Sequence, residues 1–336
     1  MKKYFAIIVL CIVAVTLVCG GLSACGQKEG VIRLTEVTHS VFYAPLYVAL
    51  EQGYFEEEGL TIDLSNGGGA DNCMTALISG QADIGLMGPE AAIYVAAAGR
   101  KEYPVIFTQL TAKDGSFLMG RNPEPDFKWE NLKGKEIIGG RRGGVPAMTL
   151  EYALSLNGLI DGENFTLNYD VKYDLIGAAF EGGTGDYCTM FEPAASNMQK
   201  AGKGYIVASV GEAAGDMPFT AFMATKSYLQ ENHDTVVAFT RAIVRGMQYV
   251  NTHTPEETAQ ALIGSFDGTD ADTLAAAIRS YRDIGAYSTT PVMARKDFDH
   301  LQDVIAQAGI LEKRADYDLL VDNSIAQSVM EQLGIQ

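Results

Sequence analysis

The sequence predicts an α/β fold of two lobes, with the first lobe built from both ends of the chain. Strands and helices alternate from Val31 onward, the pattern of a mostly parallel sheet with helices on both faces. A second alternation of strands and helices begins near Phe117, and an apolar stretch at 219–225 is expected to return the chain to the first lobe. From Ser227 the pattern changes to amphipathic helices. We therefore expect lobe 1 to contain residues 31–115 and 220–336, and lobe 2 to contain residues 116–219.

Four short apolar runs in the first part of the chain predict the strands of lobe 1, at 31–37, 61–64, 82–87 and 105–110. Pro45 suits the first turn of the helix after the first strand. Gly67, Gly68 and Gly69 permit a tight turn after the second strand, and Asp71 is expected to cap the next helix.

Lobe 2 is expected to start with a strand at 117–120 and a surface connection that contains Trp129. A strand at 136–139 runs into a glycine turn and a helix. Further elements are predicted at 165–169, 175–181 and 186–190. After Ser227, apolar residues at helical spacing predict helices within 233–253, 255–266, 270–284, 294–310 and 323–333.

The first 25 residues are predicted to be a targeting segment, because a basic start (Lys2, Lys3) precedes a short apolar core. The tetrapeptide LSAC at 22–25 resembles a bacterial lipobox, in which the signal is removed before Cys25 and that thiol receives lipid. Residues 26–30 would then be a polar tether from the membrane. The alternative is an ordinary secretory signal or an uncleaved anchor.

Composition excludes several function classes. The formal net charge of −17 argues against nucleic acid as a partner and against electrostatic attachment to anionic lipid. Of five cysteines, only Cys73 and Cys188 lie after the lipobox. We expect them in different lobes as two buried thiols, with a disulfide as the alternative. Four scattered histidines form no metal-binding pattern, so no metal or cofactor is expected.

Two glycine-rich turns follow predicted strands. The GRRGG turn at 140–144 can present backbone N–H groups and an arginine to an anionic group, which makes Arg142, Gly143 and Gly144 candidate ligand contacts. The alternative is that its arginines are solvated turn residues. The GGGAD turn at 67–71 is the matching position in lobe 1, and we include Gly69 and Ala70 there. Gln109, at the end of the fourth strand, is also included.

Aromatic and acidic side chains at the strand ends are the most informative group. Aromatic rings can stack on a flat heterocycle, and carboxylates accept hydrogen bonds from exocyclic amines, whereas a bare sulfonate or nitrate needs no carboxylate. The alternative is that the rings belong to the core and that Glu90 only complements a helix dipole. The candidate contacts in this group are Phe42, Tyr43, Glu90, Tyr187 and Glu192, with His39 as a polar loop residue near them. The rings of Phe42, Tyr43 and Tyr187 are expected to stack on the ligand, and Phe191 lies in the same segment as Tyr187.

Two segments carry a family resemblance. FYAPLYVALEQGYFEEEGL at 42–60, followed by GGGADNCMTALISGQADIGLMGPE at 67–90, resembles the substrate-binding proteins of ABC importers for nitrate, sulfonate, taurine and thiamine-pyrimidine precursors. The resemblance implies a type II periplasmic-binding-protein-like fold, in which two α/β lobes close on a ligand in the cleft between them. It also implies an ABC permease and an ATPase as partners. We expect a monomer.

Together these observations predict a lipid-anchored extracytoplasmic solute-binding protein whose ligand is a thiamine-pyrimidine precursor or a related heteroaromatic. Glu192→Ala is expected to weaken binding at least about tenfold. The first alternative is an alkanesulfonate, taurine or small-anion binding protein. The second is a cofactor-biosynthesis enzyme on the same fold. No nucleophile with a paired base is recognisable, so we expect no enzymatic activity.

Overall fold

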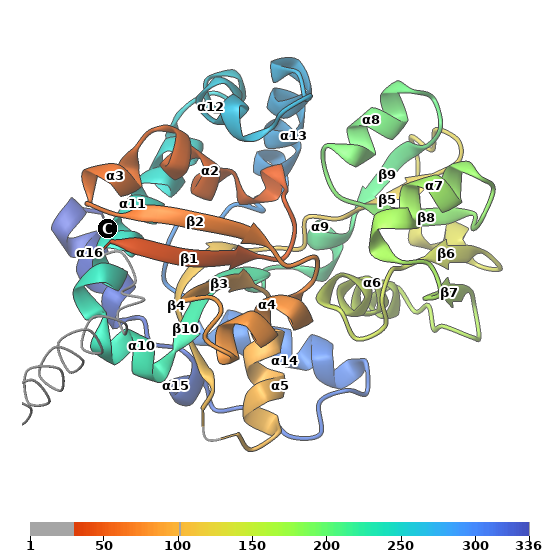
Figure 1. Ribbon diagram of the computed structural model, residues 1–336. Helices are drawn as coiled ribbons and strands as arrows, with labels where there is room; N and C mark the ends of the chain where they lie inside the picture. The colour runs from red at the N-terminus through yellow and green to blue at the C-terminus, as the bar shows by residue number, and fades with distance from the viewer. Residues whose placement is uncertain (1–29, 101, 336) are drawn as a thin grey trace, which may run out of the picture. The chain divides into compact units, whose positions relative to one another are not determined.

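Two five-stranded sheets organise the computed structural model, which describes residues 30–100 and 102–335 (Figure 1). The first sheet has the order β2 (Thr61–Asn66), β1 (Val31–Glu36), β3 (Ile84–Met87), β10 (Thr220–Thr225) and β4 (Pro104–Thr111). The second has the order β7 (Thr166–Asn168), β6 (Glu136–Ile138), β8 (Tyr187–Met190), β5 (Phe117–Gly120) and β9 (Tyr205–Ser209). The expected α/β fold of two lobes is confirmed.

Each sheet contains antiparallel as well as parallel pairs of strands, which corrects the expectation of mostly parallel pairing. The antiparallel strand is β10 in the first sheet and β5 in the second. In the first sheet β1 pairs parallel with β3, but β10 pairs antiparallel with both β3 and β4. In the second, β6 pairs parallel with β7 and β8, while β5 is antiparallel to β8 and β9. A strand that comes back from the second sheet enters the first sheet from the opposite end, so it runs against its neighbours.

Helices of the first lobe cover both faces of its sheet (Figure 1). The long helix α11 (His233–Thr252) packs on α2 (Ala44–Glu51) and α3 (Tyr54–Glu57), while α4 (Ala70–Ile78) packs on β3. Pro45 lies in the first turn of α2, as predicted. The remaining elements on the chain before β5 and after β10 are η1 (Val41–Tyr43), α5 (Glu90–Ala97), α10 (Lys226–Glu231), α12 (Pro255–Leu262), η4 (Ile263–Ser265), α13 (Ala271–Asp283), α14 (Arg295–Gln307), α15 (Tyr317–Leu320) and α16 (Ser324–Leu333).

The second lobe is smaller, and the C-terminal helices reach it. Its helices are η2 (Trp129–Leu132), α6 (Val145–Leu156), η3 (Tyr173–Leu175), α7 (Ile176–Glu181), α8 (Ala194–Lys200) and α9 (Val210–Ala214). The helices α13 and α14 contact α8 and α6, respectively. Strand β9 and helices α8 and α9 lie in stretches where no element was predicted. The lobe boundaries at 115/116 and 219/220 stay a proposal.

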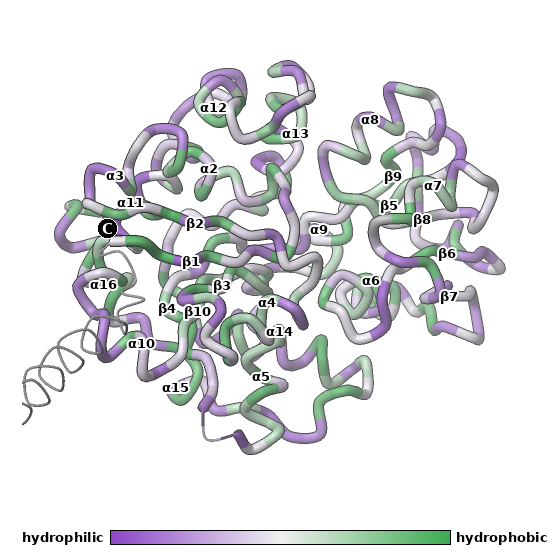
Figure 2. The backbone as a smooth tube through the Cα atoms, viewed as in Figure 1, coloured by the Kyte–Doolittle hydropathy of each residue, from purple (hydrophilic) through white to green (hydrophobic). Residues whose placement is uncertain are grey.

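Apolar residues concentrate along the strands and hydrophilic ones along the outer loops (Figure 2). Leu34, Leu86 and Phe222 are fully buried in the first sheet, as are Leu118 and Cys188 in the second. This burial is the main source of stability, at about 25 cal/mol for each Å² of apolar surface removed from water. Cys73 and Cys188 are both free and buried, as expected, and they belong to different lobes. The predicted lipidation at Cys25 lies outside the described residues.

Candidate ligand-binding site

Strand direction brings the loops after three strands to one edge of the first sheet. Strands β1 and β3 are parallel, and β4 has the same direction as β3 because each is antiparallel to β10. Phe42, Tyr43, Glu90 and Asp114 all follow these strands closely. In an open α/β sheet the carboxyl ends of the strands form the ligand-binding edge. Phe191 follows β8 in the same way in the second lobe.

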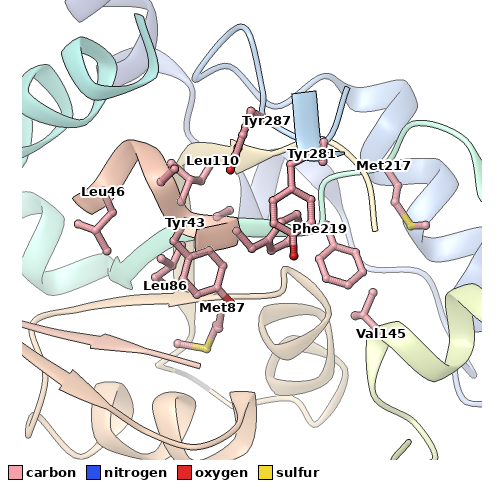
Figure 3. Close-up of a cluster of buried hydrophobic side chains, with 14 of the residues drawn as sticks. Tyr43, Leu46, Leu86, Met87, Leu110, Val145, Met217, Phe219, Tyr281 and Tyr287 are labelled. Atoms are coloured by element: carbon pink, nitrogen blue, oxygen red, sulfur yellow. The ribbon is translucent and has the colours of Figure 1, made fainter. Parts of the chain in front are cut away.

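An aromatic cluster around Phe42 joins the two lobes. The Phe42 ring lies 4.9 Å from Tyr281, 5.8 Å from Tyr43, 5.6 Å from Phe191 and 5.7 Å from Phe219, measured between ring centroids. Figure 3 shows Phe219 and Tyr281 side by side, with Val145 of α6 facing Phe219. Such tilted and edge-on contacts are the favoured geometry for aromatic pairs. The structure therefore brings the predicted contacts Phe42 and Tyr43 together with Phe191, whereas Tyr187, the third ring expected to stack, lies against Phe127.

Glu90 is a buried carboxyl group at the start of α5. It is 5% exposed, and its Oε2 atom has no hydrogen-bond partner. Burial raises the pKa of Glu90 to about 7, against the lowering effects of the adjacent backbone N–H groups and of Arg141. An acid with a free oxygen in this position can accept a hydrogen bond from a ligand. Glu90 also lies in the first turn of α5, where its charge complements the helix dipole, so the ligand contact and the helix-dipole role both stay predictions.

Residues near the end of β4 also have buried side-chain atoms without a hydrogen-bond partner, and only Gln109 among them was predicted from the sequence. Gln109 is 4% exposed and its Oε1 atom is unpartnered. Asp114 and Ser116, on the segment that leads to β5, are fully buried, and their Oδ2 and Oγ atoms are unpartnered as well. Burial raises the pKa of Asp114 to about 7. The only sequence signal for Asp114 was an acid shortly after a strand.

The Glu192 side chain is hydrogen-bonded to the first turn of α8, which it precedes. Its two carboxylate oxygens accept hydrogen bonds from the backbone N–H and the hydroxyl of Ser196, at 2.9 and 2.7 Å. The Glu192 backbone N–H donates to the hydroxyl of Tyr281 at 2.8 Å, which joins the lobes. These contacts are those of a residue that caps α8 and holds the lobes together, so we propose no ligand contact for its carboxylate.

Tyr187 lies at the amino end of β8, the end away from Phe191. Its hydroxyl donates to Glu124 at 2.8 Å, and its ring meets Phe127. The strand separates Tyr187 from the residues that follow Met190. We therefore leave Tyr187 out of the proposed site.

His39 is held within the first lobe. Its Nδ1 atom lies 3.1 Å from Glu36, and its Nε2 atom lies 2.6 Å from the carbonyl oxygen of Ser265. The ring also packs against Tyr47 and Phe266. The hydrogen bond with Glu36 raises the pKa of His39. Both ring nitrogens therefore have protein partners.

The arginines of the GRRGG turn have different partners. Arg141, for which no single role was preferred, reaches across to Asp71 at 2.7 Å. Arg142, the preferred ligand contact, lies over the ring of Tyr169 at 4.0 Å from its centroid. Of the two arginines, Arg141 is thus the one whose ion pair joins this turn to the first lobe. A ligand contact by Arg142 stays a prediction.

The two glycine turns form as expected, apart from one cap. Gly69 (φ 149°) is the N-cap of α4 and Ala70 is its first residue, so the expectation that Asp71 caps this helix was wrong. The carboxylate of Asp71 turns instead to Arg141. Gly143 (φ 77°) and Gly144 precede α6, and Tyr94 of α5 donates to the Gly143 carbonyl at 3.4 Å.

Among the acidic and basic residues in the described part of the chain, only acidic ones are buried. They are Glu36, Asp83, Glu90, Asp114 and Glu192, each at most 5% exposed. No group of metal-binding residues occurs between residues 30 and 335, residue 101 aside, and no helix there has the length and apolarity to span a membrane. Two surface hollows of about 360 and 370 Å³ are lined by other residues than the predicted contacts. The aromatic cluster with Glu90 is therefore the candidate site.

Comparisons with known proteins agree with this architecture. A family model described as the NMT1-like family matches residues 30–264. A protein of Bacillus subtilis (strain 168), named "Putative binding protein YtlA", is 42% identical over 310 residues, which cover 92% of this chain and 93% of that protein.

Solved structures show the same fold at low sequence identity. The alkanesulfonate-binding protein SsuA from Xanthomonas axonopodis pv. citri, bound to MOPS, has a TM-score of 0.71 and 16% identity, over 89% of this chain and 100% of that one. The nitrate-binding protein NrtA from Synechocystis PCC 6803 has a TM-score of 0.68 and 16% identity, over 91% of this chain and 89% of that one.

Proposed function

The chain belongs to the NMT1-like family, and from this premise we propose that it is the solute-binding protein of an ABC importer. The solute would bind where the two lobes meet, and a membrane permease with its ATPase would receive it. The B. subtilis relative is named "Putative binding protein YtlA", and the alkanesulfonate- and nitrate-binding structures share the fold. The single observation that carries the proposal is the aromatic cluster around Phe42, which takes rings from both lobes.

The chemistry of this cluster favours a flat solute with hydrogen-bond donors. The rings of Phe42, Tyr43 and Phe191 meet in this cluster, where Phe191 is partly exposed and Phe42 and Tyr43 are only 2% and 3% exposed. Glu90 offers a buried acceptor oxygen without a protein partner. A buried polar group without a partner costs on the order of 1–3 kcal/mol, which a donor on the solute would offset. We therefore propose an aminopyrimidine such as a thiamine precursor, or a related heteroaromatic amine.

A small anion is the second candidate, and the GRRGG turn is the observation in its favour. Arg141 and Arg142 stand at the start of α6, where an anion could bind. Against it, Arg141 is paired with Asp71 and Arg142 covers Tyr169. No basic side chain of the described residues is buried, so a buried anion would depend on backbone N–H groups of the turn.

Lipid anchoring through Cys25 is proposed from the LSAC tetrapeptide at 22–25. The lipid would hold the protein on the extracytoplasmic face of the cell membrane, beside its permease. Cell fractionation tests this. The natural protein should sediment with membranes, and Cys25→Ser should appear either unprocessed or in the soluble fraction as a shortened chain. Equal membrane association of processed Cys25→Ser would exclude the lipid anchor.

A thermal-shift panel tests the binding function. It should include an aminopyrimidine precursor of thiamine, riboflavin, nucleobases, taurine, alkanesulfonates and nitrate. A solute present at about a hundred times its dissociation constant stabilises the protein by about 2.7 kcal/mol, an easily measured shift. We expect a shift with amine-bearing heterocycles. A shift with sulfonates or nitrate alone would favour the second candidate.

A further inference from the structure

Asp114 lies on the segment that joins the two sheets, between β4 and β5. Its Oδ1 atom accepts a hydrogen bond from the backbone N–H of Ser116 at 2.5 Å, whereas its Oδ2 atom has no partner. The residue is 0% exposed. Neighbouring backbone leaves little room, since a Cβ atom on Gly211 would lie 2.1 Å from the Asp114 carbonyl oxygen. A fixed backbone therefore holds this carboxyl group in place.

Unpartnered buried oxygens are confined to a small region of the described chain. The four side-chain atoms without a partner belong to Glu90, Gln109, Asp114 and Ser116. All four residues lie near the carboxyl ends of β3 and β4, which run in the same direction. Elsewhere in the described residues buried polar side chains find partners, as is usual in folded proteins. The exceptions therefore mark a place where another molecule supplies the hydrogen bonds.

The charged groups near Asp114 do not neutralise it. Lys113 is its neighbour in sequence, but the Lys113 ammonium donates to the carbonyl of Ile284 and pairs with Asp216. The backbone N–H of Ser116 donates to the Oδ1 atom, and hydrogen bonding lowers the pKa of Asp114 less than burial raises it. Burial therefore outweighs the hydrogen bonds that favour the charged form, and the pKa of Asp114 rises to about 7.

The ring of Tyr173 contacts the aromatic cluster. Surrounding protein raises the pKa of Tyr173, and the charge of Asp114 adds to this effect. The Tyr173 ring meets Phe191 at 6.0 Å, and 47% of the residue is exposed. Burial raises the pKa of Tyr281 and of Tyr43, with Tyr173 among the smaller contributors in both cases. Tyr173 is thus an exposed residue whose ring contacts the aromatic cluster through Phe191.

We propose that Asp114 is a second ligand-contacting carboxyl group, which accepts a hydrogen bond from an amino group of the solute. This inference rests on the proposed binding function and specifies its solute class. Asp114 and Glu90 would select a solute with an amino or ammonium group, and Tyr173 would cover its ring. Because Asp114 belongs to the segment between the lobes, the contact also ties the solute to the place where the lobes are joined.

Matched pairs of solutes test this assignment. One pair is an aminopyrimidine precursor of thiamine and the same ring without its amino group; the other is taurine and ethanesulfonate. Calorimetric titration of the natural protein, Asp114→Asn and Asp216→Asn gives the affinities. Asp216 is the matched control because it lies on the return segment, is exposed at its side chain and is already paired with Lys113.

For whichever pair binds, the natural protein should prefer the amine, and Asp114→Asn should reduce this preference at least about tenfold. Asp216→Asn should keep the preference of the natural protein. A preference unchanged in folded Asp114→Asn would overturn the role of Asp114 and leave the binding function intact. Binding of the amine-free solutes alone would overturn the solute class. No binding in either pair would remove both the solute class and this inference, while the broader thermal-shift panel decides the binding function separately.

Discussion

Buried acidic side chains at the two ends of the first sheet differ in whether their oxygens have partners in the chain. At the amino ends of the strands, Asp83 accepts hydrogen bonds from the backbone N–H of Arg33 and from its guanidinium, at 2.5 to 3.0 Å. At the carboxyl ends, Glu90 and Asp114 each keep one oxygen without a partner. Both kinds of acid are at most 5% exposed. Burial alone therefore does not separate them; the presence of a cation does.

The two kinds of buried acid have different roles, one in the stability of the fold and the other in ligand binding. A buried carboxylate that is paired within the chain holds the fold together, and removing its partner leaves an uncompensated charge. A buried carboxyl group without a cation weakens the fold when it ionises, and it is tolerated where a ligand can use it. The amino ends of β1 and β3 thus stabilise the sheet, and the carboxyl ends of β3 and β4 are available for recognition.

The largest expected effect is at the paired end. Asp83→Ala removes the partner of Arg33 and should lower the free energy of unfolding by about 3 kcal/mol in urea denaturation. Asp318→Ala is the control, because its pair with Arg295 is exposed and should contribute less than about 1 kcal/mol. If the two variants lose equal stability, the distinction between the two kinds of pair fails.

At the carboxyl ends of the strands, Glu90→Gln should change the pH dependence of the free energy of unfolding. The folded pKa of Glu90, about 7, exceeds its ordinary value of 4.5, so the folded state holds the proton more tightly and loses stability as pH rises through this range. The amide of the substituted side chain cannot ionise. The ligand-free variant should therefore gain roughly 2–3 kcal/mol on the natural protein between about pH 5 and pH 8. Parallel stability curves over this range would mean that Glu90 ionises freely in the fold.

Glu192→Ala distinguishes a structural role of this carboxylate from a ligand contact. The sequence analysis predicted at least a tenfold loss of affinity, but the structure shows the carboxylate engaged by Ser196. We now expect a loss of about 1 kcal/mol in stability, as for other helix caps. The affinity of the folded variant should change less than tenfold. A larger loss of affinity at unchanged stability would return Glu192 to the ligand site.

The smallest effect is expected for the exposed contact between the lobes. The side chains of Arg141 and Asp71 are 57% and 75% exposed, so water screens their attraction. Arg141→Ala should cost less than about 0.5 kcal/mol of stability and change solute affinity by at most about threefold. Urea denaturation and calorimetry measure both. A loss of affinity above tenfold would assign Arg141 to the solute and favour an anion.

Much of the fold could be predicted because strand and helix periodicity is local. The runs at 31–37 and 105–110 became β1 and β4, and the family resemblance of residues 42–60 and 67–90 is confirmed by the match over residues 30–264. The antiparallel placement of β10 could not be predicted from its own residues. It depends on the direction in which the chain returns from the second lobe.

The candidate site was predictable only in part. Phe42, Tyr43 and Glu90 follow strands of the first sheet, so their place at one edge follows from that sheet, while Phe191 follows a strand of the second sheet. Tyr187 could not be assigned to one end of β8 until the bounds of that strand were known. Asp114 required the tertiary structure, because its lack of a partner depends on where Lys113, Thr149 and Gly211 lie.

The central claim is that a hydrogen-bond donor on the solute meets buried carboxyl groups at the carboxyl ends of β3 and β4. The most direct measurement compares the calorimetric affinity of the natural protein for an aminopyrimidine precursor of thiamine with that for the same ring without its amino group. We predict that the amine binds at least about a hundredfold more tightly, since two charge-assisted hydrogen bonds of roughly 1.4 kcal/mol each would be lost. Equal affinities for the two rings would contradict the account.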